Sequence, residues 1–260
     1  RTKMTIPPVM DDVAAMIAFE LGEKLQIPAY IYDAISADEL ADIARFSGMP
    51  ALPRKSLCHV LNMRAMGRKA AEKLGKDYRK MNIIVAHLGG GITVSIHQQG
   101  KMVDIASDDE GPFSPERAGR VPCRDFLDLC YSGKHDHQTM RKLLRGRGGL
   151  VGYLGTSNAI EVERAIQSGN EESKQVYEAM AYQIAKAIGE LATVVNGEVD
   201  IIVLTGGLAY SQMLTGWVSD RVKFIAPVEI FAGENETESL ALGVLRVHLG
   251  EETAHEYLQG

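Results

Sequence analysis

Residues 82–120, NIIVAHLGGGITVSIHQQGKMVDIASDDEGPFSPERAGR, decide the fold of this chain. Short runs of apolar and β-branched residues at 83–86 and 92–96 predict two strands, and a third is expected at 102–105 after a polar turn. Gly89-Gly90-Gly91 join the first two strands. Because these glycines join two strands, they match neither the G-x-G-x-x-G of dinucleotide-binding folds, which opens a helix, nor the P-loop.

The three glycines and the loop after them have two interpretations each. The glycines can form a tight hairpin with a bulge, or they can bind phosphate, because backbone without side chains lets several N–H donors approach an anion. Pro112 and Pro115 stiffen the following loop. They would hold Arg117 near the glycines, where a guanidinium can bind phosphate or carboxylate with two hydrogen bonds. The alternative for Arg117 is a surface ion pair with Asp109 or Glu116.

A second glycine signal lies about a hundred residues further on. Residues 200–204 are predicted to form a strand, Thr205-Gly206-Gly207 a turn, and a helix is expected to begin near residue 208. A strand followed by a turn and a helix N-terminus is an arrangement suited to a nucleotide.

Composition limits the classes of protein and partner. The chain has 260 residues, of which 45% are hydrophobic and 24% charged, as expected for one or two globular domains. The net charge of −6 argues against nucleic acid or an anionic membrane as a main partner, and no apolar run of about 18 residues predicts a membrane span. The three cysteines are odd in number and lack C-x-x-C spacing, which indicates free thiols in a reducing cytoplasm.

Three motifs in this order resemble the signatures of the butyrate kinases: AHLGGG at 86–91, EGPFSPERAG at 110–119 and VLTGGL at 203–208. Butyrate kinases belong to the acetate kinase branch of the actin-like, sugar kinase and heat-shock ATPase superfamily. The resemblance runs from about residue 20 to the C-terminus. It implies an α/β fold, with a ribonuclease-H-like lobe of mixed sheet and flanking helices. It also implies reversible phosphate transfer from ATP to a short-chain carboxylic acid such as butyrate.

The resemblance implies three catalytic residues. Asp33, expected at the end of a short strand over 27–33, matches the active-site aspartate of the family; as a plain structural feature it would cap a helix. His59 stands eleven residues before an Ala-Ala-Glu run, as does the catalytic histidine of acetate kinases. Arg117 is the third catalytic residue that the resemblance implies. Acetate kinases read His-Gly-Thr-Ser-His where this chain reads His-Val-Leu-Asn-Met from residue 59, which favours the butyrate kinase side.

The same resemblance implies ATP and Mg²⁺. Asp33 and Glu236 would hold the metal, with Glu238 as a rival because a one-residue gap leaves the alignment ambiguous. Both glutamates also suit the first turn of a helix for purely structural reasons.

A loop over 149–158 holds the nucleotide in relatives, typically through Ser-Asp-x-Arg. Here Asn158 and Ile160 replace both charged residues, so contact with ATP would use backbone or the Asn158 amide. The nucleotide-binding residues expected from all these motifs are Gly89, Gly90, Gly91, Gly155, Asn158, Thr205, Gly206 and Gly207.

Nothing in residues 1–30 resembles the Gly-Ser-Thr-rich phosphate loop that opens related kinases. We therefore expect 1–33 to be the remnant of a first lobe, 34–235 a second, nucleotide-binding lobe, and 236–260 a helix returning toward the first. Two other functions stay open: a non-catalytic or truncated nucleotide-binding protein of the same fold, and a chaperone-like or sugar-kinase relative. The expected partners are ATP or ADP, the carboxylate and a second copy of the chain in a homodimer.

Overall fold

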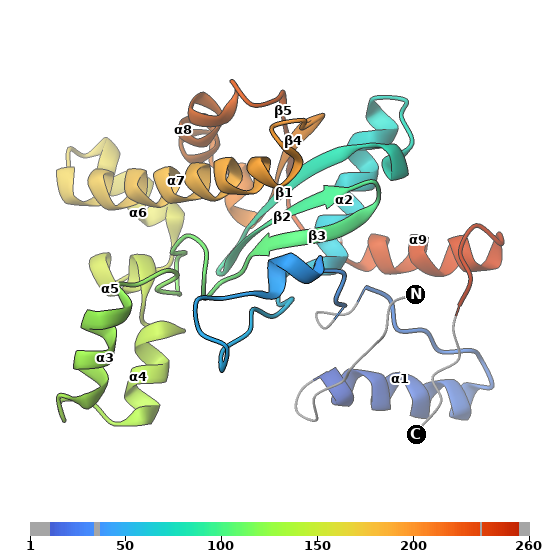
Figure 1. Cartoon of the computed structure of the whole chain (residues 1–260), viewed down its shortest axis with the longest axis horizontal. Coiled ribbons are helices and arrows are strands. Elements are labelled where there is room, and N and C mark those ends of the chain that lie inside the picture. Colours follow the sequence, from blue (N-terminus) through green and yellow to red (C-terminus); the bar gives the residue numbers. More distant parts are fainter. Residues whose placement is uncertain (1–10, 34–36, 235, 255–260) are drawn as a thin grey trace.

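A five-stranded mixed sheet forms the centre of the molecule (Figure 1). The structure is a computed structural model that describes residues 11–33, 37–234 and 236–254. Strands β1 (Asn82–Leu88), β2 (Ile92–Gln98) and β3 (Lys101–Ala106) form an antiparallel meander, and β4 (Ile201–Gly206) and β5 (Val228–Ala232) lie parallel to β1, in the order β3-β2-β1-β4-β5. The four strands described above around the two glycine motifs are confirmed, as is the predicted mixed sheet flanked by helices.

Alternating side chains of β1 separate two apolar cores. Ile84 and its even-numbered neighbours pack with α7 (Glu171–Ala192) and α8 (Gln212–Val222), whereas Ile83 and Val85 pack with α2 (Val60–Lys73) on the other face. This follows from the two-residue period of a strand. The odd-numbered His87 therefore belongs to the face covered by α2.

The long helix α7 supplies the core of its layer. Met180, Ile184 and Ile188 recur every four residues and are fully buried, as the helical period requires. Asn170 caps the helix by accepting a hydrogen bond from the Ser173 backbone N–H, and two glutamates follow in its first turn.

Shorter helices follow the meander in the sequence. These are α3 (Cys123–Tyr131), α4 (His137–Leu144), α5 (Gly149–Leu154) and α6 (Ala159–Gln167), with 3-10 turns at Asp42–Arg45, Tyr78–Lys80, Thr193–Val195 and Gly207–Tyr210. Figure 1 shows α3, α4 and α5 grouped away from the sheet, and α6 beside α7.

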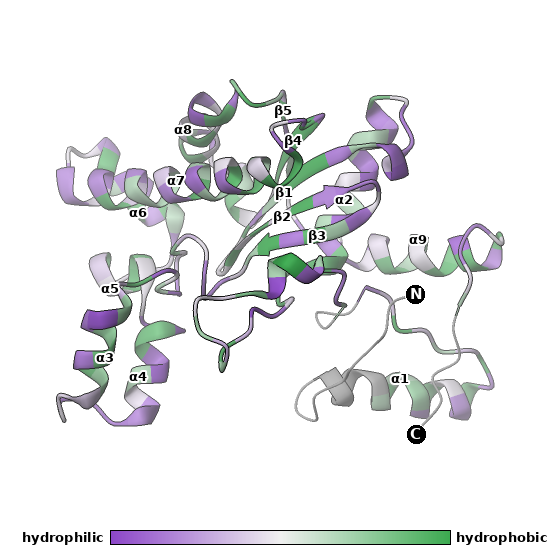
Figure 2. Cartoon of the chain, in the orientation of Figure 1, coloured by the Kyte–Doolittle hydropathy of each residue, from purple (hydrophilic) through white to green (hydrophobic). Residues whose placement is uncertain are grey.

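Two helices near the ends of the chain, α1 (Asp11–Leu25) and α9 (Glu236–His248), lie on the side of α2. Figure 1 shows α1 apart from the sheet, and Figure 2 shows apolar residues along it. Ile17, Phe19 and Leu21 are at least half exposed there. The strand expected over 27–33 is wrong, because this segment runs as irregular backbone beside no strand of the described sheet. In the part of the chain that the structure describes, no helix has the length and apolar character to cross a membrane.

Candidate active site

The glycine hairpin between β1 and β2 is fixed by the loop that follows β3. The Gly89 N–H donates to the Gly91 carbonyl over 3.1 Å, and the Gly90 carbonyl accepts from the Ser114 hydroxyl at 2.7 Å and from the Glu116 backbone N–H at 3.3 Å. The EGPFSPERAG loop thus packs directly against the glycines, as its stiffening prolines predicted.

Glycine is required at position 91 because the Arg117 guanidinium occupies the space of a side chain. A Cβ on Gly91 would overlap Nη1 and Cζ of Arg117. Arg117 Nη1 forms an ion pair with Asp108 Oδ2 at 2.6 Å, and Arg145 Nη2 forms a second ion pair with the same oxygen at 3.0 Å. Asp108 is buried. The ion pairs expected with Asp109 or Glu116 are therefore replaced by a buried anchor that aims Arg117 at the hairpin.

Two histidines stack beside this guanidinium. The His59 and His87 rings lie 3.9 Å apart at an interplanar angle of 14°. His59 precedes α2, and its Nδ1 is 2.9 Å from Thr93 Oγ1 on β2; His87 lies on β1, and its Nδ1 is 2.9 Å from Asn62 Oδ1. The structure thus brings the predicted His59 and Arg117 together.

The surroundings of both imidazoles lower their pKa and so favour the neutral form. Burial lowers the pKa of His87 to about 3, with further contributions from His59 and Arg117. Burial also lowers the pKa of His59, as does the charge of Arg117, while Asp108 opposes this. His87 was not given a role in the sequence analysis. The signal that could have identified it is its odd-numbered position on β1, which places it on the face covered by α2, as His59 is placed by preceding α2.

A cavity of about 200 Å³ opens in front of the hairpin. Gly89, Gly90 and Glu116 line one side, and Gly207 lines another. The structure therefore joins the two glycine motifs at one site. The remaining lining residues are Pro115, Ser157, Leu208 and Glu234.

Thr205 and Gly206 hold the strands rather than line this cavity in the described part of the chain. Thr205 is fully buried, and its hydroxyl lies 3.4 Å from the Gly233 carbonyl. Gly206 has φ +92°, and a Cβ there would lie 2.5 Å from the Leu88 carbonyl oxygen. Glycine is thus needed where β1 and β4 approach closely.

Most of the nucleotide loop predicted over 149–158 is helix α5, and only residues 155–158 form the turn between α5 and α6. Gly155 ends α5 in the left-handed conformation, with φ 74°, and Asn158 begins α6 by accepting the Ile160 N–H at 3.0 Å. The Asn158 Nδ2 donates to Glu161. Gly155 and Asn158 therefore have local structural roles. In the described part of this turn, Ser157 is the residue that lines the cavity.

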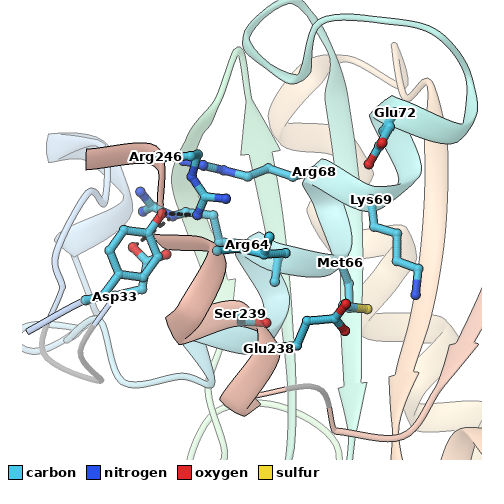
Figure 3. A pocket seen from close by; sticks show the side chains of 12 residues that line it. Asp33, Arg64, Met66, Arg68, Lys69, Glu72, Glu238, Ser239 and Arg246 are labelled. Carbon is cyan, nitrogen blue, oxygen red and sulfur yellow. Dashed lines mark hydrogen bonds and ion pairs between the residues drawn. The ribbon is translucent and has the colours of Figure 1, made fainter. Parts of the chain in front are cut away.

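Asp33 lies in a second cavity of about 220 Å³, between α2 and α9 (Figure 3). Its carboxylate is 3.3 Å from Arg64 Nε, and Arg64 also donates to Glu39 at 2.8 Å. Burial raises the pKa of Asp33, and Arg64 opposes this shift. The structure does not bring Asp33 to the lining of the glycine cavity.

Both candidate glutamates are exposed in the first turn of α9, and of the two only Glu238 lines the cavity that contains Asp33. Figure 3 shows Glu238 extending toward Met66 of α2. Among the described residues, no three His, Cys, Asp or Glu side chains gather as a complete set of metal ligands. A metal here would need ligands from its substrate as well.

Known proteins match this chain over most of its length. Residues 54–227 match the model of the acetokinase family. Butyrate kinase 2 of Clostridium acetobutylicum is 46% identical over 248 residues, which is 95% of this chain and 70% of that protein. A probable butyrate kinase of Listeria monocytogenes is 48% identical over the same shares of the two chains.

Solved structures agree on the fold. The acetate kinase of Porphyromonas gingivalis superposes with a TM-score of 0.79 at 22% identity, covering 90% of this chain and 68% of that one. A propionate kinase of Francisella tularensis gives 0.76 at 18% identity, covering 88% and 68%. The motifs at 86–91, 110–119 and 203–208 are thus carried on the same fold as in these kinases. With two thirds of its residues matched by the family model and relatives that are nearly half identical, this chain belongs to the acetokinase family.

Proposed function

We propose that this protein is a carboxylate kinase that makes an acyl phosphate from ATP and a short-chain carboxylic acid such as butyrate, in a reversible reaction. Membership of the acetokinase family and the butyrate kinase relatives support this activity over that of a non-catalytic nucleotide-binding protein. The single observation that carries it is the convergence of Arg117, His59 and His87 on the glycine hairpin.

The proposed mechanism is transfer of the γ-phosphoryl group in line. A carboxylate oxygen of the substrate forms a bond to the γ-phosphorus, the bond from that phosphorus to the β–γ bridging oxygen breaks, and ADP leaves with the electron pair. Catalysis is then mainly positioning and charge neutralisation. Arg117 and His59 would stabilise negative charge on the phosphoryl oxygens. Their anchors, Asp108 and Thr93, hold both groups in place before the substrate arrives.

The backbone of Gly89, Gly90 and Gly91 would approach the phosphates. Gly207 and the turn between α5 and α6 would contact the rest of the nucleotide from the other side of the cavity. The Asn158 amide is engaged in capping α6, so this turn would contribute mainly backbone and Ser157. This replaces the charged Ser-Asp-x-Arg contact of relatives.

A Mg²⁺ ion that is partly held by phosphate needs only one or two protein carboxylates. Asp33 and Glu238 line one cavity and would hold it, which favours Glu238 over Glu236. Arg64, Arg68, Lys69 and Arg246 line the same cavity, so phosphate oxygens would have to share the ion and offset these positive charges. The ion would neutralise charge on the ATP phosphates. Burial raises the pKa of Asp33, and a nearby cation would favour its charged form.

We also propose the lobe division 1–33, 34–235 and 236–260, a homodimer and a cytoplasmic location. The division is supported by the sheet and its covering helices α2, α7 and α8, which fall within 60–232. By contrast, α1 lies apart from the sheet (Figure 1).

The activity is tested by trapping acyl phosphate with hydroxylamine from the chain, Mg-ATP and unbranched acids of two to five carbons. We expect product with a maximum at four carbons, and its loss in Asp33→Asn. A chain that binds ATP yet gives no hydroxamate with any acid would refute the proposed activity and favour a nucleotide-binding protein. A maximum at two carbons would refute the butyrate assignment alone.

A further inference from the structure

Each of the two stacked histidines has its Nδ1 within hydrogen-bond distance of one uncharged side chain. His59 Nδ1 meets Thr93 Oγ1 and His87 Nδ1 meets Asn62 Oδ1, both at 2.9 Å. Asn62 is fully buried, and His87 and Thr93 nearly so. Both contacts use Nδ1, so it is the Nε2 atoms that remain for the active site.

The direction of the His59 hydrogen bond follows from the partner of Thr93. The Thr93 hydroxyl lies 3.4 Å from Met63 Sδ, and a thioether can only accept, so the single hydroxyl proton points to sulfur. With that proton on sulfur, Thr93 Oγ1 accepts the Nδ1–H of His59, and this tautomer is the first part of our inference. Met63 stands where acetate kinases have the second histidine of their motif.

The direction of the His87 hydrogen bond follows from the Asn62 amide. The atom of Asn62 that meets Nδ1 is the carbonyl oxygen, which only accepts. In this orientation His87 Nδ1 carries the proton, and the buried Asn62 Nδ2 has no hydrogen-bond partner among the described residues. His87 Nε2 lies close to two residues that line the glycine cavity: it is 3.8 Å from Glu234 Oε1 and 3.0 Å from the position of a Cβ on Gly89.

We infer that Asn62 is a positioning residue that fixes His87 as its Nδ1–H tautomer, and that Thr93, oriented by Met63, does the same for His59. Both neutral imidazoles then present an Nε2 lone pair to the phosphate site. This inference rests on the proposed function only where it concerns phosphate.

A consequence is that either imidazole can bind phosphate through Nε2 only after it takes up a proton, because an Nε2 lone pair repels phosphate oxygens whereas a protonated Nε2–H binds them. The stacking distance of 3.9 Å disfavours two positive charges, so the pair takes up one proton and not two. The charged groups around the pair are Arg117, Arg145, Asp108 and Glu234.

The direct test is ¹⁵N NMR of the histidine ring nitrogens in the unliganded chain at neutral pH, with assignment through His59→Gln and His87→Gln. We expect Nδ1–H for both rings in the wild type, and Nε2–H for His87 in Asn62→Leu, which removes the acceptor. An Nε2–H tautomer of His87 in the wild type would mean that Asn62 donates, and would overturn the inference. So would an unchanged tautomer in Asn62→Leu.

A second variant serves if Asn62→Leu does not fold. Asn62→Asp keeps the acceptor and adds a charge that favours imidazolium, so the pH at which kcat falls on the alkaline side should rise by about 1–3 units. The matched control is Asn170→Asp, an exposed helix cap where aspartate serves equally well, and its profile should not move. An unshifted profile in Asn62→Asp would refute the coupling. The NMR result does not depend on activity, so failure of the proposed function would not be mistaken for failure of this inference.

Discussion

Gly91→Ala should abolish most of the activity because the added methyl group displaces Arg117. The alanine side chain itself takes no part in the reaction. A Cβ at position 91 would overlap Nη1 and Cζ of Arg117 and would lie 3.0 Å from its Nε. The guanidinium must therefore leave its place against the hairpin, and the 2.6 Å contact with Asp108 must lengthen or break.

The expected loss in kcat follows from the contribution that one positioned hydrogen-bond donor makes to stabilising a transition state. Losing such a donor costs about 10²–10³ in kcat, or roughly 3–4 kcal/mol. Stability should change by less, about 1–2 kcal/mol, because Arg145 remains 3.0 Å from the buried Asp108 and still neutralises it. Folding and activity should thus separate in this variant.

The assay is hydroxamate formation with butyrate and Mg-ATP, with urea denaturation for stability, in Gly91→Ala, Arg117→Ala and the double variant. Since both single changes remove the same interaction, the double variant should be little worse than either. Gly189→Ala on α7 is the matched control, because its Cβ would meet nothing within 4 Å. Wild-type kcat in Gly91→Ala, or losses that simply add in the double variant, would refute the reasoning.

The other predictions concern the metal, pH and the core. Glu238→Gln should raise the Mg²⁺ concentration needed for half-maximal activity, whereas Glu236→Gln should not, because only Glu238 lines the cavity of Asp33; equal effects in a Mg²⁺ titration would contradict the assignment. Burial lowers the pKa of His97 to about 3. Its neutral form is therefore favoured in the folded chain, and the stability it contributes is complete above about pH 6.5 and is lost as pH falls toward 3. In urea denaturation between pH 4 and 6, wild type should lose about 1.4 kcal/mol per pH unit more than His97→Gln, and parallel slopes would argue against this. Ile184→Ala, at a fully buried position, should cost about 2–5 kcal/mol in the free energy of unfolding; a loss below 1 kcal/mol would show that the core collapses around the site.

The sequence by itself determined the elements whose signal is local. The apolar and β-branched runs on either side of Gly89-Gly90-Gly91 and the four-residue spacing along α7 depend only on neighbours within one element. The motifs also identified the family. For these features, the periods of two and 3.6 residues are physical consequences of backbone geometry, so they can be read without knowing the fold.

Only the tertiary structure decided which side chains meet. Asp108 rather than Asp109 or Glu116 anchors Arg117, because the loop turns the buried carboxylate inward. Asn62 reaches His87 because α2 covers the odd-numbered face of β1. The segment over 27–33 was expected as a strand but takes no part in the described sheet, and its Asp33 forms an ion pair with Arg64. Pairings across tens of residues depend on how layers pack, and the sequence pattern of a single element carries no record of its partner.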